Sequence, residues 1–119
     1  MRIAPLAICA AVLALASISP QAMAQNPKGI RFWNLTLNTI TQLQMAPAGS
    51  DVWGPDQCKN DRDGTVDHDE RLRITGVEPG HYDAKFTDKI GRTCVVRNVE
   101  LKDGAVFSTE EKELTDCKN

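Results

Sequence analysis

The sequence lacks an excess of positive charge and the motifs of the common active sites. Its 14 basic residues are outnumbered by 16 acidic ones, which argues against binding to a nucleic-acid backbone, where a basic face is expected. It has no nucleophile elbow and no glycine-rich oxyanion loop, and its two histidines are too few for a transition-metal site. We therefore predict a protein without enzymatic activity that does not bind nucleic acid.

Long apolar segments are also absent beyond the first residues of the chain. The one apolar run, residues 3–18, follows Arg2 and precedes Ala22 and Ala24, the small residues that signal peptidase requires. The run is too short for a spanning helix, so we predict a signal peptide over residues 1–24 and no membrane span. Residues 25–119 would keep 13 basic and 16 acidic residues, a formal charge of −3, as a periplasmic or secreted bacterial protein.

Cysteines are few, and one of the four, Cys9, leaves with the signal peptide. Cys58, Cys94 and Cys117 remain in an oxidising compartment, where they allow one disulfide and one odd thiol. The closure entropies of the three possible loops are too similar to choose between them. We favour Cys94–Cys117, which leaves Cys58 either buried and inert or available for an intermolecular bond.

What the chain has in abundance is short alternating segments separated by turn residues. Residues 39–46 are the clearest, because Leu43 and Met45 alternate with Gln42 and Gln44. Similar patterns predict strands over 28–36, 70–75, 92–101 and 105–108, and Tyr82, Ala84 and Phe86 line one face of another.

The connections between these segments favour an all-β fold. Residues 102–104 (KDG) are typical of a hairpin turn, and a bulge or two-sided burial is expected within 92–101. The tail is compatible with one helical turn or with a last strand that docks through Cys117. We predict six or seven short strands in one small antiparallel β-sandwich domain over residues 25–119.

The longest segment without strand character is residues 51–70, DVWGPDQCKNDRDGTVDHDE. Its oxygen-bearing residues resemble those of a calcium loop, in which alternate ligands surround a glycine, here Gly64. The predicted ligands are the Thr65 carbonyl and the side chains of Asp61, Asp63, Asp67 and Glu70. Lys59 occupies the position of the first carboxylate and no helices flank the loop, so the alternative is a solvated acidic turn.

Both tryptophans are candidates for a partner surface, because tryptophan is favoured at interaction hot spots. Trp33 lies beside Phe32, and Trp53 begins a Trp-Gly-Pro sequence. The alternative is that both residues are anchors, with Trp53 pinning the long loop onto the sheet.

A set of residues spread over most of the mature chain resembles a family of small exported bacterial domains without assigned function, marked by a Trp-Gly loop and a Tyr-Asp strand. The resemblance covers residues 30–101 and implies a β-sandwich without catalytic residues. The chain departs from the pattern in its longer, more acidic loop and in the positions of Cys58 and Cys94. The matching residues are Phe32, Asn34, Thr36, Ile40, Leu43, Ala46, Pro47, Asp51, Trp53, Gly54, Pro79, Gly80, Tyr82, Asp83 and Gly91.

These patterns favour an exported, non-enzymatic binding module that presents residues 51–70 to an unknown protein or envelope partner. One alternative is a structural domain stabilised by calcium bound in residues 59–70. Another is a small hydrolase that uses His81 and Asp83.

Overall fold

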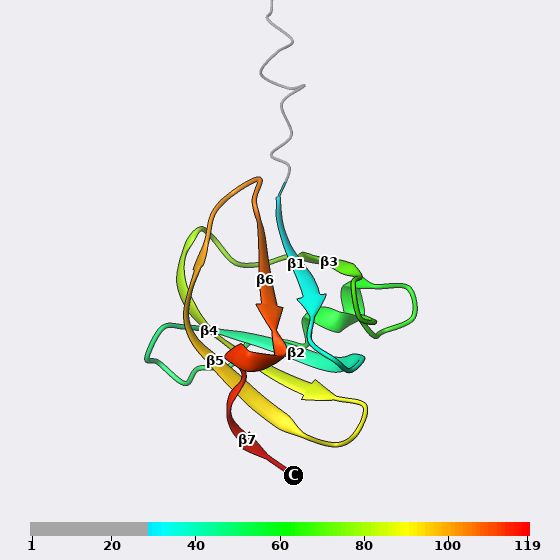
Figure 1. Cartoon of the computed structure of the whole chain (residues 1–119). Helices are drawn as coiled ribbons and strands as arrows, with labels where there is room; N and C mark the ends of the chain where they lie inside the picture. The colour runs from blue at the N-terminus through cyan, green and yellow to red at the C-terminus, as the bar shows by residue number, and fades with distance from the viewer. Residues whose placement is uncertain (1–28) are drawn as a thin grey trace, which may run out of the picture.

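The computed structural model describes residues 29–119, which form two β-sheets packed face to face (Figure 1). Two short 3-10 turns complete the described part, where no helix is long and apolar enough to cross a membrane. The predicted signal peptide lies outside the described residues. The small β-sandwich is thus confirmed. Sheet A has the order β3 (Arg71–Ile74), β1 (Ile30–Leu35), β6 (Val106–Glu110); sheet B has the order β2 (Ile40–Pro47), β4 (Gly80–Asp88), β5 (Thr93–Leu101), β7 (Thr115–Lys118); the turns are η1 (Gln57–Asn60) and η2 (Glu111–Glu113).

The alternating residues of the strands build the core between the sheets. Leu43 and Met45 of β2 are buried, while Gln42 of the same strand is exposed, as a period of two requires. Phe32 of sheet A lies at the centre, with its ring centroid 5.2 Å from Phe86 of sheet B and 5.2 Å from Phe107 of sheet A. The Phe32–Phe86 contact joins the two layers, and the Phe32–Phe107 contact lies within sheet A.

Sheet A departs from the predicted antiparallel arrangement in one strand pair. Strands β1 and β6 are parallel, because residues 102–105 carry the chain from sheet B into sheet A and not into a hairpin. Hydrogen bonds from Gly104 N to Gly29 O and from Arg31 N to Ala105 O start β6 beside the start of β1. The hairpin predicted at residues 102–104 is therefore wrong, although the turn itself is present.

Two finer predictions for the C-terminal half are confirmed. The pairing of β4 with β5 shifts between Tyr82 and Ala84, opposite Asn98, which has a positive φ of 57°, so β5 contains a bulge. The tail forms both of the expected structures, first the turn η2 and then β7, which pairs with β5.

Candidate functional site

Residues 51–70 do not project freely from the sandwich but lie along the edge of β2. Gly54 N donates to Met45 O (2.8 Å), and the Asp56 carboxylate accepts from Leu43 N (3.0 Å). Further along, Val66 is fully buried and pairs with Ile40 in an isolated bridge. The unpaired edge of sheet B at β2 is therefore covered by this segment, which we call the edge loop.

The edge loop also covers sheet A at β3. The side-chain amide of Gln57, in η1, donates to Thr75 O (2.9 Å) and accepts from Thr75 N (3.0 Å), as a neighbouring strand would. Asn60 Nδ2 donates to Arg73 O (2.9 Å). The edge loop thus closes one side of the sandwich from β2 to β3, and most of its polar groups bond to the chain itself.

Three of the five predicted calcium ligands accept hydrogen bonds from within the chain. Asp61 accepts from Asp63 N, Asp67 accepts from the Thr39 hydroxyl, and Glu70 accepts from Asp67 N. Thr65 directly precedes the buried Val66. Within residues 29–119 no three Asp, Glu, His or Cys side chains lie close enough together to hold a metal ion. The structure does not gather these residues, and calcium binding stays a prediction.

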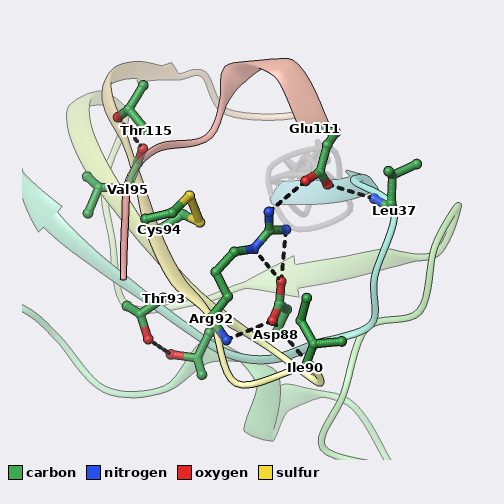
Figure 2. The surroundings of a disulfide bond; sticks show 11 residues. Leu37, Asp88, Ile90, Arg92, Thr93, Cys94, Val95, Glu111 and Thr115 are labelled. Carbon is green, nitrogen blue, oxygen red and sulfur yellow. Dashed lines mark hydrogen bonds and ion pairs between the residues drawn. A yellow bond between two sulfur atoms is a disulfide. The ribbon is translucent and has the colours of Figure 1, made fainter. Parts of the chain in front are cut away.

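The disulfide lies where it was favoured, between Cys94 of β5 and Cys117 of β7. Figure 2 shows the ion network nearby: Arg92 lies between Asp88 (2.9 Å) and Glu111 (2.8 Å). The disulfide and this network fasten the C-terminal tail to sheet B.

The remaining thiol, Cys58, belongs to the edge loop and is fully buried. Burial and the neighbouring Asp56 raise the pKa of Cys58 to about 12. Of the two states expected for Cys58, buried and inert or available for an intermolecular bond, this conformation has the buried one.

Asp83 on β4, which is 2% exposed, lies beside the residues that lead into the edge loop. Its carboxylate accepts hydrogen bonds from Gly49 N, Asn98 N and the Arg97 guanidinium, which also contacts Asp51. Burial by itself raises the pKa of Asp83, but these hydrogen bonds and the charge of Arg97 outweigh it and lower the pKa below its ordinary value.

The hydrolase alternative pairs Asp83 with His81. The bonds to Asp83 join residues 49–51 to β4 and β5, and the bonds found for its carboxylate do not include one from the exposed His81. Asp83 is thus a structural carboxylate in this fold.

Each tryptophan lies beside a cation, Trp33 on β1 of sheet A and Trp53 in the edge loop. Trp53 is half-buried with the Lys85 ammonium 4.6 Å from its ring centroid. Trp33, on β1, is half-buried with the Arg71 guanidinium 4.2 Å from its ring centroid, and its Nε1 donates to Asp69 at 2.9 Å. Trp33 is therefore held in one orientation on the outer face of sheet A.

Three arginines surround Trp33 on that outer face. The register places Arg31 opposite Arg73 and Trp33 opposite Arg71, while the alternate residues of both strands point into the core. Val106 and Ser108 of β6 lie beside Arg31 and Trp33 on the same face. We call this surface the arginine face; it consists of Arg31, Trp33, Arg71, Arg73, Val106 and Ser108.

The arginines of this face have no carboxylate partner. All three are exposed, and the ion pairs found within residues 29–119 involve other cations. Residues 1–28 contain no Asp or Glu that might pair with them. On the outer face of sheet B, by contrast, Arg97 contacts Asp51 and Asp83. Unpaired positive charge thus gathers on the arginine face.

Sequence reasoning selected Trp33 but missed the arginines around it. The sequence shows that Arg71 and Arg73 alternate with Leu72 and Ile74, but it does not show which strand pairs with β3. That partner, β1, comes about 40 residues earlier in the chain, and only their register brings Arg31 opposite Arg73.

Comparisons with family models, with curated proteins and with solved structures found no match for this chain.

Proposed function

We propose that the chain is an exported, non-enzymatic binding module that contacts a protein or envelope partner through the arginine face. Export to the periplasm or the medium is supported by the signal-like N-terminal sequence and by the disulfide, since disulfides persist in oxidising compartments. The proposal also follows the resemblance to small exported bacterial domains.

One observation carries the choice of surface: Arg31 lies directly opposite Arg73, and within residues 29–119 neither forms an ion pair with a carboxylate. Like charges at opposite positions of antiparallel strands destabilise a sheet. A site kept at a cost in stability is typical of a functional surface. An anionic partner would relieve this repulsion. The same two positive charges therefore lower the stability of the free protein and strengthen binding.

The edge loop has a supporting role in this proposal. Its hydrogen bonds to β2 and β3 hold the sandwich closed, and its last turn places Asp69 against Trp33. We therefore assign the partner surface to sheet A, including the predicted Trp33, and not to residues 51–70 with Trp53.

Co-sedimentation of the oxidised protein with bacterial envelope fractions tests the proposal. We expect the Arg31→Thr/Arg73→Thr variant to lose at least about tenfold in binding, since Trp and Arg dominate interaction hot spots. Its free energy of unfolding should be unchanged or higher by up to about 1 kcal/mol, because the repulsion is removed.

The matched control is Arg62→Thr/Lys102→Thr, which removes two exposed positive charges outside the arginine face. It should bind as the unmodified protein does. Equal binding by the Arg31→Thr/Arg73→Thr variant would contradict the proposed function.

A further inference from the structure

The chemistry of the arginine face identifies the kind of partner it fits, given the proposed function above. Its cations are all arginines, with no lysine among its residues. Tryptophan and arginine are enriched in protein–protein interfaces, whereas lysine is depleted. Arginine also presents a planar fork of donors that binds a carboxylate through two hydrogen bonds. These properties favour a protein partner that supplies carboxylates.

The spacing of the arginines matches an extended chain. Arg71 and Arg73 are two residues apart on β3, which places their Cα atoms about 7 Å apart. Side chains on one face of an extended peptide repeat at this same distance. Two acidic residues at alternate positions of such a peptide therefore align with Arg71 and Arg73, and Arg31 lies beside the second of them.

The centre of the face is already ordered for binding. Asp69 has a left-handed backbone, with φ of 70°, which aspartate tolerates better than most residues. Its amide donates to Asn34 O and its carboxylate accepts from the Trp33 indole. With the Arg71 guanidinium also over its ring, Trp33 loses little freedom when a partner binds.

Other anionic partners fit this face less well. A membrane surface needs several apolar anchors beside the basic residues, but the arginine face offers Val106, which is 38% exposed, and the half-buried Trp33. The more exposed aliphatic side chains, Leu37, Val52 and Ile90, lie on loops outside sheet A. Three arginines in a chain of formal charge −2 make too few phosphate contacts for nucleic acid.

We propose that the arginine face binds an extended acidic segment of another protein, with carboxylates at alternate positions pairing with Arg71, Arg73 and Arg31. The Trp33 side chain contacts the bound segment between these ion pairs. The contact is non-covalent and is weakened by salt, because exposed ion pairs are screened.

Fluorescence anisotropy of a labelled ten-residue peptide with glutamate at alternate positions and threonine between them tests this inference. At low salt we expect saturable binding that Arg73→Thr weakens about tenfold and Arg62→Thr changes less than about twofold. A peptide of the same composition with its glutamates in one block should bind more weakly, because fewer carboxylates match the arginine spacing.

Several outcomes would overturn the inference. These are equal binding by the Arg73→Thr variant, no preference for the alternating peptide, tighter binding to heparin or to vesicles with anionic lipids, and self-association of the chain alone in sedimentation. If envelope binding depends on the arginines but the peptide does not bind, this inference fails and the proposed function stands. If envelope binding ignores the arginines, the proposed function itself fails.

Discussion

Asp83 is the residue on which three separate segments of the chain converge. It accepts hydrogen bonds from residue 49 before the edge loop and from residues 97 and 98 in the bulge of β5. A buried carboxylate with this many donors is favourable only while it is ionised. Its contribution to stability should therefore depend on pH.

We expect Asp83→Ala to lower the free energy of unfolding by about 2–4 kcal/mol at neutral pH, because buried donors lose their acceptor. The folded-state pKa lies below the unfolded value of about 3.9, so this stabilisation is complete above that value. It is lost as the pH falls through the lowered folded pKa. Chemical denaturation of both proteins from neutral to strongly acidic pH measures the effect.

The control for this prediction is His81→Ala, at an exposed position of the same strand, which should leave stability nearly unchanged. A difference between the unmodified protein and Asp83→Ala that stays constant down to strongly acidic pH would show that the charge of Asp83 is not responsible.

At the scale of elements, the strands were predictable and the edge loop was not. Residues 39–46 alternate between apolar and polar side chains, and the strand Ile40–Pro47 forms with Leu43 inward as expected. The edge loop has no such period, because it satisfies strand edges with individual groups such as the Gln57 amide. Its acidic residues suggested a metal site, whereas in the fold they accept hydrogen bonds from backbone amides, as Asp56 does, or from side chains, as Asp67 and Asp69 do.

Gln57 is the element-scale test of this role. We expect Gln57→Ala to destabilise the domain by about 1–3 kcal/mol, because the N–H and C=O of Thr75 both lose a partner. Gln42→Ala, which shortens an exposed glutamine on β2, should cost less than about 0.5 kcal/mol. Urea denaturation compares the two. Equal effects would mean that the edge loop does not depend on Gln57.

For the whole molecule, the two-layer β architecture could be inferred from the sequence, but the order of strands within each layer could not. Alternation tells which side of a strand is buried and contains no information on its neighbour. The pairs β1–β3 and β1–β6 join residues far apart in the chain. The arginine face depends on these pairs, so it became visible only in three dimensions.

Calcium dependence is a property of the whole molecule, because an ion that binds only the folded state raises its stability by mass action. Since three of the predicted ligands already accept hydrogen bonds within the chain and the described acidic side chains are not gathered around one point, we expect about 10 mM calcium to shift the unfolding temperature by less than about 1 °C relative to a chelator. Thermal unfolding measures this. A rise of several degrees that Asp63→Ala abolishes would show that the edge loop rearranges around the ion.

The parallel pairing of β1 with β6 has a consequence for the order of events during biosynthesis. Strand β6 begins at residue 106, so it cannot pair with β1 until that residue has left the ribosome. Such non-local pairing has a high contact order and slows folding. An incomplete chain can pair β1 with β3 but lacks the third strand of sheet A. Sheet A is therefore complete only after residues 106–110 have been synthesised.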